Sequence, residues 1–343
     1  MIDEASLDMK IGVVGAGSWG TALANLLARK GYPVDWWIFE ADVCRQIVET
    51  GVNSVFLPDV RLSENLRPTN DLARAVQDKE LVLIVVPSHV IRQVAVQMAA
   101  LLPSQTVVVC ASKGIENETL LTMSGVLREA LPHLDADRYA TLSGPSFARE
   151  VAFGLPTVVT AASRNLSCAR KVQSVFATPV FRVYTNDDVI GVELGGSVKN
   201  VIAIAAGMID GLGMGLNTRA ALIARGLTEI RRLGLAMGAN PRTFTGLAGV
   251  GDLVLTCTGN LSRNHTVGLK IGQGMGLAQV LAEMRMVAEG VKTARSVYAL
   301  SQRLEVEMPI SQAVYRILYE GLSPQDAAYQ LMTRDLKCEL DDD

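Results

Sequence analysis

Lys199 is a solitary cation in an apolar segment of the chain. Positions 183–198 and 200–218 hold no other lysine or arginine. On a helix, the residues that share its face are Ile202, Ala203 and Ala206. An ammonium group among such neighbours loses hydration, and this loss lowers its pKa toward the range useful for proton transfer. In the alternative interpretation, the stem of Lys199 lies on apolar surface and its ammonium group reaches water.

A glycine-rich motif near the start of the chain indicates a nucleotide site. Gly15, Gly17 and Gly20 form a GxGxxG pattern that follows a predicted strand and opens a predicted helix. In this context backbone N–H groups approach a pyrophosphate at the helix N-terminus. Glu40 lies twenty residues after the motif, where a carboxylate accepts a hydrogen bond from a ribose 2′-OH and repels a 2′-phosphate; a glutamate that merely ends a strand in solvent is the alternative. The sequence therefore favours NAD(H); NADP(H) is the alternative, because Arg45 is close enough in sequence to swing toward a 2′-phosphate.

Other segments carry polar groups suited to an anionic substrate. Lys113 follows a predicted strand, where it would polarise a carbonyl or bind an anion; a solvated loop lysine is the alternative. Ser262 is expected to cap a helix that begins at Arg263, and an arginine at a helix N-terminus suits a phosphate group; an ordinary cap with an exposed arginine is the alternative. If Asp252 lies near Lys199, its carboxylate orients the ammonium group.

The elements that must position these residues alternate in the first half of the chain. Strands are expected at Lys10–Gly15, Val34–Glu40, Leu81–Pro87, Thr106–Ala111 and Thr157–Ala162. Helices such as Thr21–Arg29 and Val90–Leu101 lie between them, which predicts a mainly parallel, doubly wound sheet flanked by helices. His89 also follows a strand, but a loop histidine is more often structural or exposed than catalytic. The turn Ser143–Ser146 offers hydroxyl and backbone donors.

After about Gly195 the pattern changes to helices, for example Leu216–Met237 and Val291–Arg303. Ser323 precedes a proline and then an acid at the third helical position, which predicts another helix start. We therefore expect an α/β Rossmann domain at residues 1–194, packed closely against an all-helical domain at residues 195–343. The acidic tail Asp341–Asp343 is expected to be solvated.

Composition argues against several classes of protein. The 343 residues carry a formal net charge of −3 and no basic block, so no nucleic-acid partner is expected. Five scattered cysteines without a CxxC pair, and only three histidines, argue against a metal site and for reduced thiols. The segment Met1–Met9 lacks the order of a signal peptide, and the apolar run Val201–Ile209 is too short to span a bilayer. We expect a soluble cytoplasmic protein without membrane insertion.

The motifs described above resemble those of the bacterial-type NAD(P)-dependent glycerol-3-phosphate dehydrogenases. The matching segments span nearly the whole chain in the family's order. They are Gly-Ala-Gly-Ser-Trp-Gly-Thr-Ala at 15–22, Val-Pro-Ser-His at 86–89, Ser-Lys-Gly-Ile-Glu at 112–116, Ser-Gly-Pro-Ser-Phe-Ala at 143–148, Gly-Gly-Ser-Val-Lys-Asn-Val at 195–201, Gly-Asp-Leu-Val-Leu-Thr-Cys at 251–257, Ser-Arg-Asn at 262–264 and Val-Ala-Glu-Gly at 287–290.

The resemblance implies reversible reduction of dihydroxyacetone phosphate to sn-glycerol 3-phosphate, a precursor of glycerophospholipids, by a homodimer. It implies that Lys199 donates and accepts the proton, with Lys113 and Asp252 as further catalytic residues. The substrate contacts that it implies are Lys113, Gly144, Ser146, Lys199, Asp252, Ser262, Arg263 and Asn264. The cofactor contacts that it implies, besides the motif glycines, are Ser18, Trp19, Lys113, Ala148, Arg263, Val287 and Glu289.

One position departs from the family's pattern. Phe39 stands where the family usually has an arginine or histidine that contacts the adenosine end of the cofactor, and with Glu40 it strengthens the NAD(H) prediction. Two other functions are open: a dehydrogenase of another phosphorylated or carboxylated hydroxy compound, and a nucleotide-sensing protein without turnover. The joint presence of Lys113, Lys199 and Asp252 argues against the second.

Overall fold

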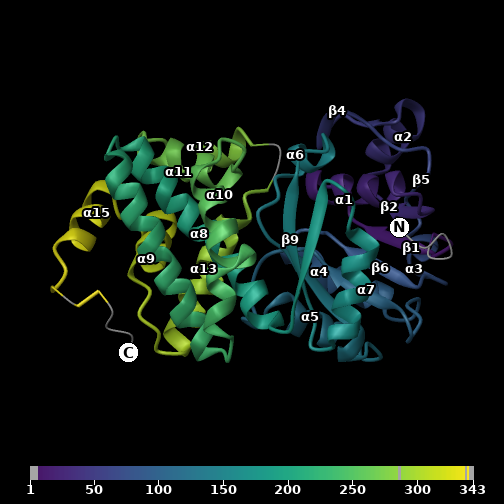
Figure 1. Ribbon diagram of the computed structural model, residues 1–343. Helices are drawn as coiled ribbons and strands as arrows, with labels where there is room; N and C mark the ends of the chain where they lie inside the picture. Colours follow the sequence, from purple (N-terminus) through teal and green to yellow (C-terminus); the bar gives the residue numbers. More distant parts are fainter. Residues whose placement is uncertain (1–6, 285–286, 337, 340–343) are drawn as a thin grey trace.

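Two bodies lie side by side in the computed structural model, an N-terminal one built on a sheet and a C-terminal one built of helices (Figure 1). The structure describes residues 7–284, 287–336 and 338–339. The tail Asp341–Asp343 and most of the segment Met1–Met9 lie outside these residues. The expected fold class, a Rossmann-type α/β domain followed by a helical domain, is confirmed.

Aliphatic runs form the centre of the N-terminal sheet, and helices cover both of its faces. The strand order is β10-β9-β8-β7-β6-β1-β2-β5, and the paired strands are parallel except for β8 and β9. The mainly parallel sheet is therefore confirmed. Its strands are β1 (Ile11–Val14), β2 (Val34–Trp37), β5 (Leu66–Thr69), β6 (Leu81–Ile84), β7 (Val107–Cys110), β8 (Tyr139–Ser143), β9 (Thr157–Ala162) and β10 (Phe181–Asn186).

The two outermost strands, β5 and β10, were not among the expected ones. β5 contains Pro68, which a sheet tolerates at its edge because one side of an edge strand needs no ladder hydrogen bonds. β10 alternates buried and exposed residues, so it lacks the continuous aliphatic run of the central strands. A separate two-stranded hairpin is formed by β3 (Val52–Asn53) and β4 (Leu57–Arg61).

The helices of the N-terminal domain fill the connections between strands. α1 begins at Ser18, within the glycine motif and three residues before the predicted start at Thr21, and it packs its buried face on the sheet. These helices are α1 (Ser18–Arg29), α2 (Ala41–Thr50), α3 (Leu72–Val76), α4 (Ile91–Met98), α5 (Met123–Ala130), α6 (Ala148–Ala152) and α7 (Leu166–Phe176).

Helix α8 (Val189–Gly211) lies at the centre of the C-terminal domain (Figure 1). It contains the apolar run Val201–Ile209 and is long and apolar enough to cross a membrane, but 94% of its most apolar window is buried inside the protein. We therefore interpret it as a core helix. The other helices are α9 (Gly215–Ala236), α10 (Asp252–Thr258), α11 (Arg263–Gly272), α12 (Leu277–Ala282), α13 (Glu289–Arg303), α14 (Pro309–Tyr319) and α15 (Pro324–Met332), the last capped by Ser323 as predicted.

Candidate active site

The residues singled out above approach one edge of the sheet. β1, β6, β7 and β8 are mutually parallel, so their carboxyl ends lie together. The segments that follow these strands hold the glycine motif, Ser88, Lys113 and Gly144. The C-terminal domain meets this edge through α8, where Ser197 donates a hydrogen bond to the Gly114 carbonyl oxygen at 3.2 Å.

Two lysines from different domains share one buried carboxylate. The Lys199 ammonium group contacts Asp252 Oδ1 and donates to Thr256 Oγ1 at 2.9 Å, and Lys113 Nζ lies 2.8 Å from Asp252 Oδ2. We call these four residues the lysine cluster. Lys199 is 6% exposed and its ammonium group is held inside the protein, so the alternative in which it reaches water is wrong. The solvated-loop alternative for Lys113 is also wrong.

Burial and neighbouring charges act on Lys199 in opposite directions. Desolvation lowers its pKa most, and the positive charge of Lys113 lowers it further. The carboxylate of Asp252 raises it, and the resulting pKa is about 7. A lysine with this pKa holds and releases a proton near neutral pH, which suits general acid and base chemistry.

The backbone before Asp252 makes an unusual turn that delivers its side chain to the lysines. A π-helical turn, Leu247–Gly251, leads directly into α10, and such turns often occur at functional sites. Thr256 lies one helical turn after Asp252 and donates its hydroxyl proton to the Asp252 carbonyl oxygen at 2.6 Å. Its oxygen can therefore accept from Lys199. Thr256 had no predicted role, although its four-residue spacing from Asp252 places both side chains on one face of a helix.

The start of α11 is fixed by capping and by an amide network. Ser262 is the N-cap predicted from the sequence, and its oxygen accepts from the backbone N–H of His265 at 3.2 Å. The Asn264 side chain donates to Asn200 Oδ1 at 2.9 Å and accepts from the Gly290 N–H at 2.9 Å. Both ends of this amide are engaged within the protein. Arg263, between these two residues, is exposed.

Glycines bring α8 and α11 into backbone contact. A Cβ atom added at Gly268 would lie 1.9 Å from the Ile204 carbonyl oxygen, and one at Gly207 would lie 2.0 Å from the His265 carbonyl oxygen. Gly211 and Gly272 continue the contact one turn further along each helix. The N-terminus of α11 is therefore held at a set distance from the helix that carries Lys199.

We expect Gly268→Ala to lower the free energy of unfolding by at least about 2 kcal/mol, because α11 must move away from α8. Thermal or urea unfolding of the purified variant measures this loss. Gly276→Ala is the matched control: no atom lies within 4 Å of its added Cβ. Because Gly276 is the N-cap of α12, where alanine is less favourable than glycine, the control should lower stability by less than about 1 kcal/mol. Equal stability of the two variants would contradict the close packing.

The three motif glycines meet different surroundings, and these fit a dinucleotide. Gly15 has φ +118° and its Cβ would strike the Val85 carbonyl oxygen at 2.5 Å, whereas a Cβ on Gly20 would strike the Gly15 oxygen at 2.4 Å. Gly17 has no atom within 4 Å of its Cβ position, which leaves its backbone open at the start of α1. The indole N–H of Trp19 is buried and finds no acceptor among the described residues.

Further expected cofactor contacts lie along the same edge. Ser88 Oγ donates to Glu289 Oε2 at 2.5 Å, which joins the loop after β6 to the start of α13. Val287 is exposed beside it, and Ala148 begins α6. His89 is exposed, in agreement with the non-catalytic interpretation.

At the end of β2, both Phe39 and Glu40 are exposed, and the Phe39 ring lies 6.0 Å from that of Trp37 in an edge-on contact. Arg45 pairs with Asp42 at 3.0 Å and does not reach toward Glu40.

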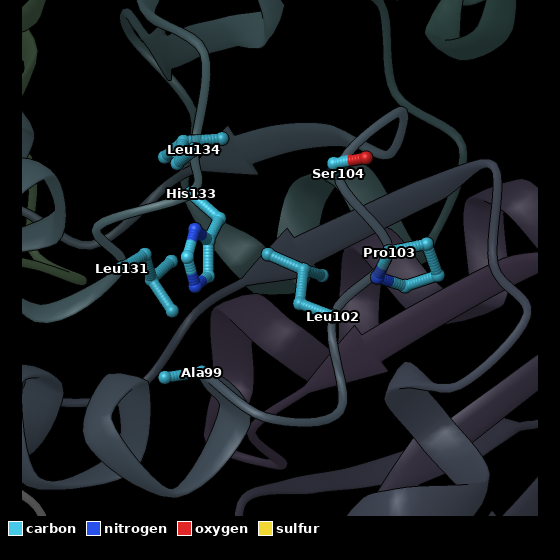
Figure 2. Close-up of a pocket in the computed structure, with 7 residues that line it drawn as sticks. All are labelled: Ala99, Leu102, Pro103, Ser104, Leu131, His133 and Leu134. Atoms are coloured by element: carbon cyan, nitrogen blue, oxygen red, sulfur yellow. The ribbon is translucent and has the colours of Figure 1, made fainter.

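A small cavity at the opposite edge of the sheet has no part in this site. It is lined by Ala99, Leu102, Pro103, Ser104, Leu131, His133 and Leu134 (Figure 2). These residues precede β7 and β8, and the volume of about 10 Å³ is room for a single water molecule. Among the described residues, no group of three or more His, Cys, Asp or Glu side chains is arranged to hold a metal ion.

Both domains of the chain match models of one protein family. The family model of the NAD-dependent glycerol-3-phosphate dehydrogenase N-terminus matches residues 10–169, and the model of the C-terminus of the same family matches residues 188–329. A Geobacter sulfurreducens protein named glycerol-3-phosphate dehydrogenase [NAD(P)+] is 59% identical over 330 residues, which are 96% of this chain and 98% of the relative. A Syntrophobacter fumaroxidans protein of the same name is 57% identical over 331 residues, 96% of this chain and 97% of that relative.

Solved structures extend the similarity to three dimensions. The crystal structure of glycerol-3-phosphate dehydrogenase from Coxiella burnetii has a TM-score of 0.92 and 43% sequence identity, and the match covers 96% of this chain and all of that one. A ketopantoate reductase from Ralstonia eutropha shares only 17% identity at a TM-score of 0.60, with 93% of this chain and 100% of that one covered. That second likeness concerns the fold alone.

Proposed function

The chain belongs to the NAD-dependent glycerol-3-phosphate dehydrogenase family, and we infer that it catalyses the reversible NAD(P)H-dependent reduction of dihydroxyacetone phosphate to sn-glycerol 3-phosphate. It is an oxidoreductase that acts on a secondary alcohol and the corresponding ketone. The assignment of roles rests on the lysine cluster, in which one buried carboxylate holds two lysines. Lys113 and the nucleotide motif follow parallel strands at the same edge of the sheet.

We propose that Lys199 donates the proton in the reduction. When bound, the nicotinamide supplies the hydride that reaches the C2 carbonyl carbon. The negative charge that develops on the carbonyl oxygen is stabilised by Lys113 and neutralised by the proton of Lys199. Asp252 orients both ammonium groups, and Thr256 fixes the second hydrogen bond of Lys199. In the reverse direction, neutral Lys199 accepts the hydroxyl proton.

The proposed phosphate anchor is the start of α11. Arg263 offers a guanidinium group for bidentate hydrogen bonds, and the helix N-terminus adds backbone N–H groups. Because the amide of Asn264 is engaged by Asn200 and Gly290, its contribution would come from the backbone N–H rather than the side chain. Anchoring the unreactive end of the substrate holds C2 in place, which supplies much of the rate enhancement.

Gly144 and Ser146 complete the proposed substrate site. The Gly144 carbonyl oxygen accepts from Lys113 Nζ at 3.4 Å and from Ser146 Oγ at 2.9 Å. The Gly144 carbonyl therefore contacts the lysine cluster directly, and Ser146 adjoins the cluster through Gly144, which supports their assignment.

We propose NAD(H) as the preferred cofactor, because Glu40 and Phe39 leave no cation at the end of β2 to receive a 2′-phosphate. Replacing Glu40 by glutamine removes one negative charge from that position. The ratio of kcat/KM for NADPH over NADH should then rise about tenfold. Glu49→Gln, further along α2 and also exposed, is the control that should leave the ratio unchanged. An unchanged ratio in Glu40→Gln would mean that this carboxylate does not face the ribose.

We also propose the other cofactor contacts that the family resemblance implies. They are Ser18, Trp19, Lys113, Ala148, Arg263, Val287 and Glu289.

We further propose a domain boundary at residues 194 and 195, within α8. Val189 and Val192 pack with the N-terminal domain, whereas Leu194 and Val198 pack with the helical domain, which supports this position.

We propose that the enzyme works in the cytoplasm as a homodimer and supplies glycerophospholipid synthesis. Exposed apolar side chains near the C-terminal end, Tyr329, Met332 and Leu336, are available for contact with a second copy. Light scattering of the purified protein tests the dimer.

Steady-state oxidation of NADH and of NADPH with dihydroxyacetone phosphate tests the reaction. Faster turnover with NADH is the expected result. Turnover that favours NADPH would leave the reaction intact and overturn the cofactor preference. Oxidation of neither cofactor would overturn the substrate assignment and point to another hydroxy-compound dehydrogenase of the same two-domain plan.

A further inference from the structure

Glu193 is a buried carboxylate on α8 that the chemistry described above does not use. It lies six residues before Lys199. Its two oxygens accept from the Ser124 N–H at 2.9 Å, the Ser124 hydroxyl at 2.7 Å and the Tyr139 hydroxyl at 2.6 Å. Ser124 lies in the first turn of α5 and Tyr139 begins β8, so every one of these donors comes from the N-terminal domain.

A carboxylate in this position strongly resists displacement. Burial disfavours its charged form and raises the pKa of Glu193, and the three hydrogen bonds offset that cost. Rotation or sliding of α8 against α5 would separate the carboxylate from its donors and leave it buried without partners. Removing the donors from a buried carboxylate costs much more free energy than replacing the whole network with apolar groups. The position of α8 along α5 is therefore fixed.

A second hydrogen-bonded contact with the N-terminal domain lies one turn further along α8. The buried Ser197 hydroxyl is shared between the Glu193 carbonyl oxygen at 2.7 Å and the Gly114 carbonyl oxygen at 3.2 Å. Gly114 follows Lys113 directly. Hydrogen bonds therefore join the segment of α8 before Lys199 to β8 and to the loop after β7. Both of these parts of the N-terminal domain lead to the lysine cluster.

We infer that Glu193 is a positioning residue for this dehydrogenase, which sets where Lys199 stands relative to the nicotinamide by fastening α8 to α5 and β8. The inference rests on the proposed function. Glu193 touches none of the reacting atoms; it acts through the helix that carries Lys199. The placement of Lys199 by Glu193 affects the rates of hydride and proton transfer to dihydroxyacetone phosphate. It does not affect the affinity for the cofactor.

Glu229 provides a matched comparison within the same molecule. It is also a buried glutamate on a long helix, α9, and it also caps the start of another helix, α14. It accepts from the Ile310 N–H at 2.5 Å, the Ser311 N–H at 3.0 Å and the Ser311 hydroxyl at 2.8 Å. Both α9 and α14 belong to the C-terminal domain, so Glu229 binds neither helix to the N-terminal domain.

The test compares Glu193→Leu, Glu193→Gln and Glu229→Leu in the full-length protein. Leucine is of similar size and cannot accept hydrogen bonds, whereas glutamine can accept through its oxygen and donate its amide proton to the Ser124 hydroxyl. We expect kcat for dihydroxyacetone phosphate to fall at least about tenfold in Glu193→Leu, with the Kd for NADH within about twofold of wild type. The isotope effect on kcat with NADH deuterated at the transferred position should rise, because hydride transfer becomes slower.

Glu193→Gln should stay close to wild type in kcat and isotope effect. Glu229→Leu should lose stability while the kcat of the folded enzyme and its isotope effect stay unchanged. A folded Glu193→Leu with wild-type kcat and isotope effect would overturn the inference, and so would an equal loss of kcat in Glu229→Leu.

If Glu193→Leu does not fold, Tyr139→Phe is the second variant, because it removes one hydrogen-bond donor to Glu193. Its kcat should fall about threefold, and its isotope effect should rise. An unchanged kcat and isotope effect would overturn the inference. Wild-type protein that does not reduce dihydroxyacetone phosphate would overturn the proposed function as well.

Discussion

Lys199→Ala should fold, bind NADH normally and lose about a thousandfold in kcat, the range expected when a general acid is removed. The variant keeps a partner for the buried carboxylate, because Lys113 still lies 2.8 Å from Asp252. Its fold should therefore survive. Steady-state kinetics gives kcat, and quenching of protein fluorescence by NADH gives the Kd. A kcat within about threefold of wild type would exclude Lys199 as the proton donor.

Lys79 is the matched control for this substitution. It is also a buried lysine paired with an aspartate, at 2.9 Å from Asp35, and that aspartate also keeps a second cation, Arg74. Lys79 lies just before β6, at the edge of the sheet opposite to the lysine cluster. Lys79→Ala should lower stability without changing the kcat of the folded enzyme. A loss of kcat shared by both variants would indicate damage to the fold rather than to the chemistry.

Local signals in the sequence predicted the parts of the site that one segment builds alone. The apolar face around Lys199 was visible in the helical spacing of its neighbours, which are buried in the structure. The glycine motif predicted the strand-to-helix turn, because only glycine tolerates φ +118° at Gly15. Ser262 was recognisable as a helix cap from its own position and that of Arg263.

Local sequence patterns could not predict the contacts between segments that are distant in the chain. Asp252 lies 139 residues from Lys113 and 53 from Lys199, and no periodic pattern relates the three positions. That one carboxylate holds both lysines follows from the packing of the two domains. The partners of Glu193 are equally remote, at 69 residues for Ser124 and 54 for Tyr139. A glutamate near the start of an apolar helix gave no sign that its carboxylate caps α5, a helix so distant in the sequence.

Asp252→Asn should displace the pH dependence of the reduction, because this carboxylate supports the protonated form of Lys199. In the wild type, the pKa of Lys199 is about 7, so kcat for reduction should be highest below that pH and fall as the pH rises through it. Asparagine keeps the shape of the side chain but leaves the ammonium groups of Lys113 and Lys199 without a counter-charge. An opposite charge at hydrogen-bond distance shifts a pKa by about 1–3 units, so its loss moves the pKa of Lys199 further down.

The reduction catalysed by Asp252→Asn should therefore be about a hundredfold slower than wild type at pH 7.5, and the deficit should narrow as the pH is lowered. The oxidation of glycerol 3-phosphate needs neutral Lys199, so at high pH it should lose less than the reduction does. Profiles of kcat against pH in both directions measure these shifts. Asp210→Asn, which alters a carboxylate paired with Arg219 and His265 instead, should keep the wild-type midpoint. An unchanged midpoint in Asp252→Asn would mean that the carboxylate orients the lysines without setting the protonation of Lys199.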